Sequence, residues 1–192
     1  MQSYTKFRVI GRTRDDAAGE CFDKCARAMG FPYPGGVHID KASETGDPKA
    51  FRLPHPAVAE NEFDFSFSGL KTNVINLLHN AEQKGTEINR NDLAASLQAT
   101  ISEILTDKTI SAAKSLGYKK VALAGGVSAN TGVRAALSEA CAKNGFEFYM
   151  PEKKLCGDNG AMIACQGSYN LLAGITADES LNAVASLSME EI

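Results

Sequence analysis

The sequence KKVALAGGVSAN, residues 119–130, combines a short apolar run with a glycine turn and a polar segment. Residues 121–124 have the length of a buried strand, and periodic apolar residues over 133–143 indicate the helix that follows. Gly125 and Gly126 let the main chain approach another group closely. The amides of a helix N-terminus attract phosphate and other anions. The stretch therefore predicts a strand, a turn and a helix start beside a ligand.

A second glycine turn, CGDNG at residues 156–160, also precedes an apolar helix, which should end near Leu172. Between the two turns, residues 146–150 are typical of another short strand. Strand, helix and strand at this spacing predict a right-handed parallel crossover and hence an α/β fold. Two such turns facing one crevice would form half of a nucleotide site.

The remaining pattern predicts mostly helices, joined by turns rich in glycine and proline. We expect strands at 4–10 and 63–67, a helix capped by Thr13 that runs to about Met29, a short helix at 37–42, a loop at 43–62, a helix at 70–83 and a long helix ending near Gly117.

Composition limits the classes of function. The 192 residues are 44% hydrophobic, which is ample for a core, and the formal net charge is -3 with a pI near 5.7. This charge gives no basic signature for gripping nucleic acid, so any RNA contact must be local or shared with another chain. No apolar run approaches the roughly 18 residues of a membrane span, and no signal peptide is evident, so we expect a cytoplasmic protein. The five cysteines form no CxxC pair and indicate buried, reduced thiols.

Two aspartates have both a structural and a functional interpretation. Asp23 falls opposite the apolar stripe of its helix, where periodicity favours a solvated carboxylate paired with Arg27. Asp158 lies in a glycine turn just ahead of a helix, where it could cap the helix or bind a cation. The three histidines share no metal-binding spacing, and a G-x-S-x-G nucleophile motif is absent, which gives a hydrolase little support.

Four segments together resemble one family. They are GRTRDDAAGECFDKCARAMGFPYPGG (11–36), FDFSFSGLKT (63–72), LAGGVSANTGVR (123–134) and LCGDNGAMIA (155–164). In this order and spacing they closely resemble the tRNA N6-adenosine threonylcarbamoyltransferases, formerly called the O-sialoglycoprotein endopeptidase or glycoprotease family. The resemblance covers nearly the whole chain, and it is to the C-terminal part of such a protein.

The resemblance implies a fold and an activity. The family has the two-lobed fold of sugar kinases and actin-like ATPases, so residues 1–192 are expected to be a single α/β domain, the C-terminal lobe, with the N-terminal lobe absent. Family members transfer threonylcarbamoyl from threonylcarbamoyl-adenylate to N6 of adenosine 37 in tRNA. In the complete protein the implied partners are the adenylate, tRNA and the protein subunits of a tRNA-modification complex.

The resemblance also implies site residues. Asp23, Gly36, Asp40 and Asn130 match contacts to the adenylate, and Asp158 matches the single carboxylate ligand of an iron or zinc ion. The implied mechanism is acyl transfer in which that metal acts as a Lewis acid. The family's upstream histidine pair and its glycine-rich SGGH segment do not occur in this sequence, and Gly157 stands where threonine is common. We therefore expect weak adenylate binding, no metal held firmly, and no transfer by this chain alone.

Two other functions compete with this one. A non-catalytic relative could pair with another subunit, or with its own copy, through apolar surface left by the missing lobe. A metalloprotease, as the older family name suggests, is the least supported because the sequence has no zinc-protease motif.

Overall fold

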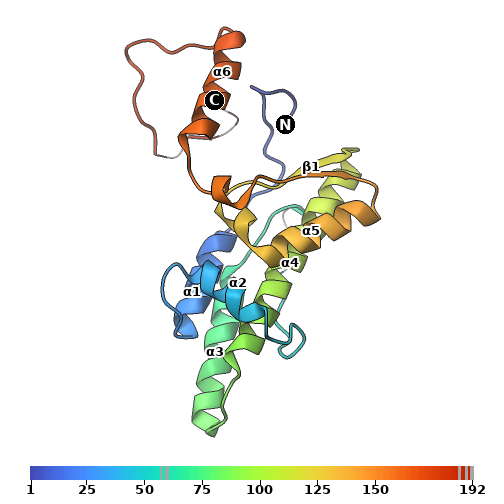
Figure 1. Ribbon diagram of the computed structural model, residues 1–192, viewed down its shortest axis with the longest axis vertical. Coiled ribbons are helices and arrows are strands. Elements are labelled where there is room, and N and C mark those ends of the chain that lie inside the picture. Colours follow the sequence, from blue (N-terminus) through green and yellow to red (C-terminus); the bar gives the residue numbers. More distant parts are fainter. Residues whose placement is uncertain (57, 59–60, 186, 189, 191–192) are drawn as a thin grey trace. The chain divides into compact units, whose positions relative to one another are not determined.

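A computed structural model of the chain describes residues 1–56, 58, 61–185, 187, 188 and 190. The chain divides into two compact units (Figure 1). The larger unit is Gly11–Cys156, and the smaller one combines Met1–Ile10 with Gly157–Ile192. The expectation of a single domain stays a prediction, and each unit is described by itself.

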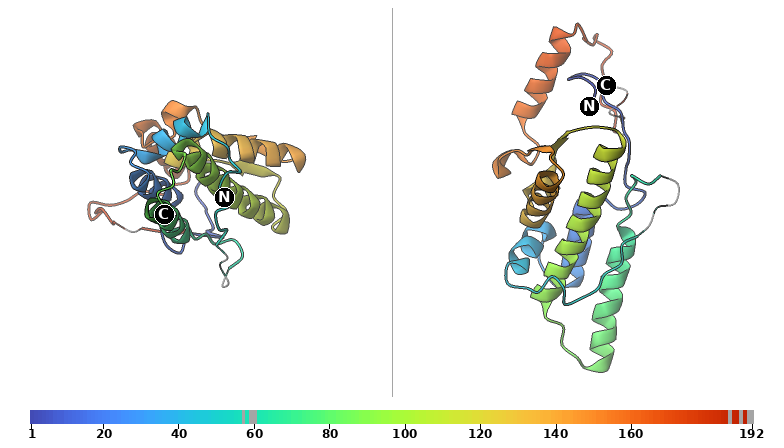
Figure 2. Two further views of the ribbon diagram at one scale, coloured as in Figure 1. Left: turned by 90° about the horizontal axis from the view of Figure 1, so that it is seen from below. Right: turned by 90° about the vertical axis from the view of Figure 1, so that its right-hand side faces the viewer.

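The larger unit is built mainly from helices that pack side by side (Figure 2). The sequence patterns predicted each of them to within a few residues at most ends. Their bounds are α1 Ala18–Ala28, α2 Gly35–Ser43, α3 Ser68–Lys84, α4 Arg90–Ser115 and α5 Thr131–Lys143. Several begin or end on the expected signals, such as the Asn89 side chain at the start of α4 and left-handed Gly85 after α3.

One apolar core joins α1, α2, α3 and α4. The predicted stripe of α1 supplies Phe22, Cys25 and Met29, which are all buried. The opposite wall comes from α4, where Leu93, Leu97 and Ile101 follow one another at helical spacing and are fully buried. Burial of side chains this large is the main stabilising term of the unit, at about 25 cal/mol per Å² of apolar surface.

The sheet has two parallel strands, as the sequence predicted. Strand β1, Lys120–Ala122, pairs with β2, Glu147–Tyr149, with Val121 opposite Phe148. Between them the chain forms a short 3-10 turn, η1 Gly126–Ala129, and then α5. The sequence predicted a turn here but not its 3-10 form, which begins at Gly126 and separates Gly125 from the start of α5. The strands therefore place the glycine turn at the carboxyl end of β1.

Two predicted strands are wrong. Residues 4–10 form only an isolated bridge between Ser3 and Lys6, and residues 63–67 form only one between Phe65 and Thr13. Side-chain carboxylates explain the second case, because Asp64 accepts a hydrogen bond from the Arg12 amide, and Asp15 accepts one from the Phe67 amide. These carboxylates replace the neighbouring strand that would otherwise bond those amides.

The start of α1 also differs from the prediction. The helix begins at Ala18, after an N-cap at Ala17 whose amide donates to the Glu20 carboxylate at 3.0 Å. The Thr13 hydroxyl instead donates to the carbonyl of Asp16 at 2.7 Å, within the turn that precedes the helix. Thr13 is therefore a turn residue and not the helix cap.

Four of the five cysteines are buried, and all five are free thiols. Cys21 and Cys25 lie one helical turn apart with their sulfurs 4.0 Å from each other. A hydrogen bond with Cys25 and burial both raise the pKa of Cys21, which keeps this thiol protonated. Cys165 is exposed, so the expectation of buried thiols is wrong for this residue.

The smaller unit contains one regular element, α6 Gly160–Leu172, in the part of the chain that the structure describes. Two contacts join it to the first residues of the chain: the rings of Tyr169 and Tyr4 stack at 4.1 Å, and the Gln166 side chain donates to the Tyr4 carbonyl at 3.0 Å. None of the residues of α6 is buried. Ile163 is 76% exposed and Leu172 is 84% exposed, which is unusual for an apolar helix.

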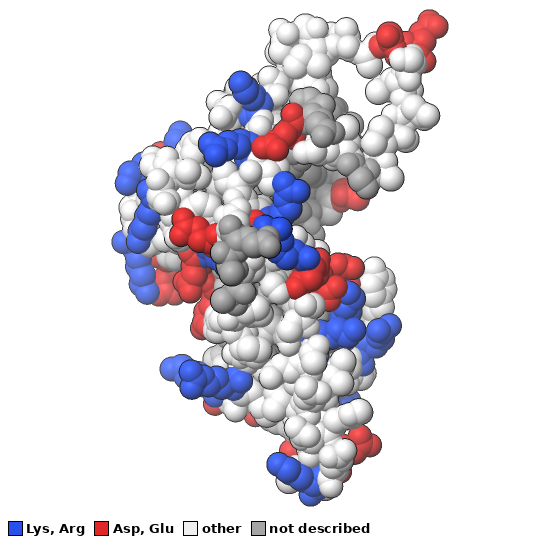
Figure 3. Space-filling model, turned by 180° about the vertical axis from the view of Figure 1, so that it is seen from behind, with Lys and Arg blue, Asp and Glu red and all other residues white. Residues whose placement is uncertain are grey.

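No described helix is both long enough and apolar enough to cross a membrane. On the face shown in Figure 3, basic and acidic side chains lie interspersed over the surface. This agrees with the composition, which gave no sign of a continuous basic surface.

Candidate functional site

Asp23 joins α1 to the start of α2. Its Oδ1 accepts a hydrogen bond from the Gly36 amide at 3.2 Å. The two helices come close because Gly35 has no side chain: an added Cβ would lie 2.5 Å from the Cβ of Ala26 and 2.8 Å from the Cα of Asp23. Asp23 therefore faces α2, and the ion pair with Arg27 that periodicity favoured does not form, so that prediction is wrong.

Asp40 joins α2 to the start of α5. Its Oδ1 accepts hydrogen bonds from the amide of Thr131 at 3.0 Å and from the Thr131 hydroxyl at 2.5 Å. Thr131 is the first residue of α5. Asp40 thus satisfies one of the free amides at the positive end of that helix, where a carboxylate is favourable.

Asn130 is the N-cap of α5 and is only 7% exposed. Its Oδ1 accepts a hydrogen bond from the Val133 amide at 3.0 Å, and its Nδ2 donates to Oε1 of Gln98 at 2.8 Å. The amides of residues 131 and 133 are therefore already bonded by the protein. The sequence predicted that the amides at this helix N-terminus would attract a phosphate. A phosphate there would have to compete with Asp40 and Asn130 for those amides.

These contacts connect four of the predicted residues in one series. Asp23 bonds to Gly36, Gly36 and Asp40 lie one turn apart on α2, and Asp40 bonds to the residue next to Asn130. Each of the two carboxylates bonds to the scaffold through one oxygen and has a second oxygen with no hydrogen bond to a described residue, whereas Asn130 uses both polar atoms and keeps one N–H. The free atoms are Oδ2 of Asp23, Oδ2 of Asp40 and the second N–H of Asn130.

The glycine turn beside this series is open. Gly125 and Gly126 are exposed, and an added Cβ on either would meet nothing within 4 Å. Gly125 has a φ of 87°, a left-handed conformation that favours glycine. The turn can therefore admit another group close to the main chain, as the sequence predicted.

Arg134 holds the 3-10 turn against the segment that leads to the second glycine turn. Its guanidinium donates to the carbonyls of Ser128 and Pro151, both at 2.7 Å, and to the sulfur of Cys156 at 3.7 Å. Arginine suits this position because its planar group presents several donors in fixed directions. The arginine lies in the LAGGVSANTGVR motif, but nothing in the sequence indicated which groups it would contact.

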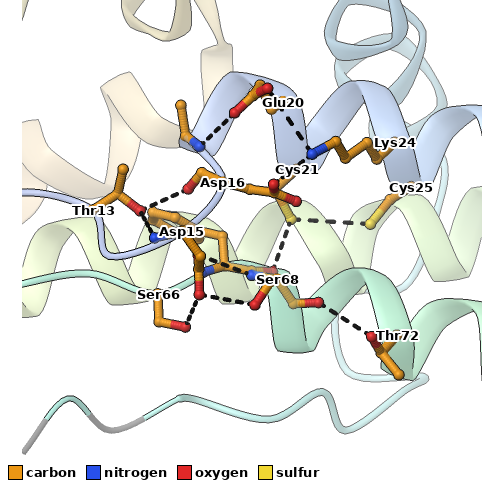
Figure 4. A network of polar contacts seen from close by, with 12 residues as sticks. Thr13, Asp15, Asp16, Glu20, Cys21, Lys24, Cys25, Ser66, Ser68 and Thr72 are labelled. Atoms are coloured by element: carbon orange, nitrogen blue, oxygen red, sulfur yellow. Dashed lines mark hydrogen bonds and ion pairs between the residues drawn. The ribbon is translucent and has the colours of Figure 1, made fainter.

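A polar network fixes α1 relative to α3 (Figure 4). The Asp15 carboxylate accepts hydrogen bonds from the hydroxyls of Ser66 and Ser68 and from the amides of Phe67 and Ser68. Burial by itself would raise the pKa of Asp15, but these hydrogen bonds outweigh it and lower the pKa to about 2. Asp15 therefore remains charged and caps α3 from another segment of the chain.

A second carboxylate anchors the segment ahead of α1. Asp64 is buried, accepts the Arg12 amide at 2.9 Å and pairs with the Arg14 guanidinium. The Arg12 hydrogen bond lowers the pKa of Asp64, burial opposes this, and the pair with Arg14 lowers it further. The sequence showed only an aromatic and polar alternation here and gave no sign that Asp64 would be buried.

Asp158 lies in the smaller unit, in the turn before α6, and its side chain is exposed. Asn159, not Asp158, is the N-cap of α6, because the Asn159 Oδ1 accepts from the Met162 amide at 3.1 Å. The capping interpretation of Asp158 is therefore wrong. Asp158, Asn159, Gly160, Met162 and Ile163 line an open hollow at this end of the helix.

The residues present do not fit a firmly bound metal. Among the described residues, no three His, Cys, Asp or Glu side chains come together in a way that could hold an ion. One exposed carboxylate leaves most coordination positions to water, which lowers affinity. A role for Asp158 as one ligand of a larger set stays a prediction.

Comparison with known proteins supports the same fold and a specific family. A solved structure of full-length HypF, in a phosphate- and nucleotide-bound form, matches 82% of this chain and 20% of its own chain with a TM-score of 0.60. At 19% identity this likeness concerns the fold alone. The protein is thus of a mixed α/β class with a parallel sheet and a chain of polar contacts beside a glycine turn.

Residues 1–165 match the family model of tRNA N6-adenosine threonylcarbamoyltransferase. The curated protein of that name from Moorella thermoacetica is 48% identical over 97% of this chain, and the one from Geobacillus kaustophilus is 50% identical over 97%. A third, from Listeria innocua, is 47% identical over the whole chain. The chain belongs to the tRNA N6-adenosine threonylcarbamoyltransferase family. It spans 55 to 56% of the length of these relatives and corresponds to their C-terminal half.

Sequence reasoning found some parts of the site and missed others. It singled out Asp23, Gly36, Asp40 and Asn130, which the structure brings into one connected series. It missed Thr131 and Gln98, the partners that hold Asp40 and Asn130. Gln98 looks like any polar residue on an amphipathic helix, and only the glycine at 132 hints that another group approaches there.

Proposed function

We propose that this chain is the nucleotide-holding part of a tRNA threonylcarbamoyltransferase of the actin-like, two-lobed type, acting in the cytoplasm. The observation that carries the proposal is the connected series formed by Asp23, Gly36, Asp40 and Asn130, in which each carboxylate keeps one oxygen free and Asn130 keeps one N–H free. The family supplies the ligand class, since its members are named for threonylcarbamoyl transfer to adenosine in tRNA.

The free atoms suit an adenosine ligand. The Oδ2 atoms of Asp23 and Asp40 can accept hydrogen bonds from ribose hydroxyls or from a base amine, and the free N–H of Asn130 can donate to a ring nitrogen or a phosphate oxygen. The open turn at Gly125 and Gly126 leaves room for the phosphate end. Because helix contacts already fix these side chains, little conformational entropy is lost when the ligand binds.

The proposed reaction is acyl transfer. The N6 amine of adenosine attacks the carbamoyl carbon of threonylcarbamoyl-adenylate and a new N–C bond forms. The bond from that carbon to the phosphate oxygen breaks, AMP leaves with this bridging oxygen, and N6 loses a proton. This chain would bind and orient the adenylate, and the geometry of its described residues identifies none of them as a general base. With about 45% of the length of its relatives unmatched, we propose that it binds adenylates weakly and transfers nothing alone.

Binding can be tested on the 192-residue chain by titrating AMP or adenosine into ¹⁵N-labelled protein and following its amide signals. We expect the shifts to concentrate on residues 23, 36, 40 and 125–131. Asp40→Asn should weaken binding at least about tenfold, the effect expected when a charged hydrogen bond is lost. Asp107→Asn, which alters an exposed carboxylate elsewhere on α4, serves as the matched control.

Transfer can be tested with tRNA and threonylcarbamoyl-adenylate. The chain alone should be inactive, and adding the N-terminal part of the Moorella thermoacetica relative as a second polypeptide should restore product. Shifts confined to regions outside the connected series would refute the site. Turnover by the purified chain alone would refute the incomplete-site proposal.

The exposed apolar helix favours a second candidate, a non-catalytic module that associates with its own copy. Met162, Ile163, Leu171 and Leu172 are all exposed on α6, and such surface drives association. Sedimentation distinguishes the two functions. A firm dimer that Ile163→Glu converts to monomer favours the module, whereas a monomer that binds AMP favours the transferase.

A further inference from the structure

Gln98 lies where α4 meets the start of α5. It is half-buried, and its Oε1 accepts the hydrogen bond from Nδ2 of Asn130 at 2.8 Å. Its neighbours Leu97 and Leu93 are part of the core, so the α4 backbone at this point is firmly held. The acceptor that faces Asn130 is therefore carried by one of the best-packed helices of the larger unit.

Gly132 provides the space through which Gln98 reaches Asn130. A Cβ on Gly132 would lie 2.6 Å from Nε2 of Gln98 and 2.8 Å from its Cδ and Cγ. Real Cβ atoms do not approach other atoms so closely. Gly132 has no positive φ, and it lies in the first turn of α5, so its backbone conformation would accept alanine. Glycine inside a helix is less stabilising than alanine, and here it stands at the position where the glutamine side chain passes.

The two contacts of Asn130 together fix how its amide is turned. Its Oδ1 is bonded to the Val133 amide, and one of its two Nδ2 hydrogens is bonded to Gln98. A side-chain amide has two donor hydrogens, so one N–H remains, in a direction set by the other contacts. Without Gln98, only the hydrogen bond from the Val133 amide would hold the Asn130 side chain. The plane of the side-chain amide could then rotate about that single hydrogen bond.

We propose that Gln98 is a positioning residue that aims the free N–H of Asn130 at the ligand, and that Gly132 is required as its clearance. The ligand part of this inference rests on the proposed function, whereas the positioning of Asn130 does not. A glutamine that only filled space would have no effect on the orientation of the Asn130 amide. Gln98 therefore acts through Asn130 and is not itself a catalytic residue.

The first test needs no ligand and follows the two Nδ2 proton signals of Asn130 by NMR in the 192-residue chain. Gln98→Met keeps the length and removes the acceptor, so the bonded proton should move upfield and the two signals should approach each other. Gln98→Glu keeps an acceptor and should leave them apart. Gly132→Ala displaces the same contact from α5 and should act like Gln98→Met. Unchanged Asn130 signals in both Gln98→Met and Gly132→Ala would overturn the proposal.

The second test measures binding of adenosine, a neutral probe that is not repelled by the charge of Gln98→Glu. Gln98→Met should weaken binding about tenfold, the typical effect of one lost hydrogen bond, while Gln98→Glu stays within about threefold of the unchanged chain. The melting temperatures of both should remain close to that of the unchanged chain. Equal loss in both variants, or loss that only follows a lower melting temperature, would show a structural role and overturn the proposal.

The two tests separate this inference from the proposed function. If the unchanged chain binds no adenosine while the Asn130 signals respond to Gln98→Met, the proposed function fails and the positioning of Asn130 stands. If adenosine binds and Asn130→Ala abolishes binding while Gln98→Met changes neither the signals nor the affinity, the site stands and the role of Gln98 is refuted.

Discussion

The helices α4 and α6 are both apolar enough to be predicted from sequence, yet they have opposite environments. In α4, thirteen of 26 residues are buried, whereas none of the 13 residues of α6 is. The difference lies in what surrounds each helix and not in the residues themselves. In the larger unit α4 contacts α2, α5 and β1, while α6 contacts Tyr4 near the start of the chain through Gln166 and Tyr169.

This comparison shows that hydrophobic periodicity predicts a helix but not its partner. A helix of 13 residues is marginal in water by itself, so α6 depends on contacts with other groups. About 45% of the length of the Moorella thermoacetica relative lies outside the part that this chain matches.

The largest expected effect is on the core of α4. Leu97→Ala should lower the free energy of unfolding by about 2–5 kcal/mol, because Leu97 is fully buried and truncation leaves a cavity. Leu172→Ala, the same change on α6, should stay within about 0.5 kcal/mol. Urea unfolding of both variants measures this. A similar loss in the two would mean that α6 is packed in solution, and the comparison would fail.

Two adjacent glycines should differ for the same reason. Gly35→Ala forces a Cβ against Ala26 and Asp23 and should cost about 1–3 kcal/mol of stability. Gly36→Ala has only an ordinary contact, 3.8 Å from the Cβ of Phe22, and should be nearly neutral. Thermal unfolding distinguishes them. If Gly36→Ala keeps its melting temperature but loses AMP binding, the result also supports a ligand contact at Gly36.

The smallest expected effect concerns two carboxylates. Asp15 is bonded by residues more than fifty positions away, whereas hydrogen bonds from the nearby Ser180 lower the pKa of Asp178, and these can persist in the unfolded chain. Asp15→Asn should therefore lower the urea midpoint at pH 7, and Asp178→Asn should not. Because Asp15 is exposed to solvent, the loss of stability in Asp15→Asn should be smaller than that in Gly35→Ala.

The contribution of the Asp15 carboxylate to folding stability should decrease at low pH. Its pKa is about 2 when folded, below the roughly 3.9 of an unfolded aspartate, so its contribution is complete above about pH 4. It should be lost as the pH falls from about 4 towards 2. The difference in urea midpoint between the unchanged chain and Asp15→Asn should therefore shrink over that range. A constant difference down to pH 2.5 would mean that the Asp15 carboxylate is not the group responsible.

Much of the local structure could be predicted from the sequence. Apolar spacing gave the five helices of the larger unit, and the two short apolar runs gave the parallel strands. The predictions failed where side chains replaced a backbone partner. Asp15 and Asp64 took the hydrogen bonds expected of a strand at 63–67, and Glu20 took over the start of α1 from Thr13. Asp15 and Asp64 bond to amides 52 positions away, and carboxylates at such distances leave no periodic signal.

The candidate site was likewise predicted only in part. The glycine turns and the motifs that resemble the family indicated Asp23, Gly36, Asp40 and Asn130. Glycine and short polar residues favour turns, so their positions can be recognised in the sequence. The partners of those residues could not be predicted. Gln98 lies 32 positions from Asn130, and Asp40 lies 91 positions from Thr131.

The sequence by itself determined the helices, the strand pairing and the family, because those follow from local spacing and from motifs that stand in the chain. Only the tertiary structure decided which atoms of the site are already bonded and which remain free. It also decided that α4 is buried while α6 is exposed. The reason is physical: propensity and periodicity act over a few neighbouring residues, whereas burial and side-chain hydrogen bonds depend on groups that the fold brings together from far apart.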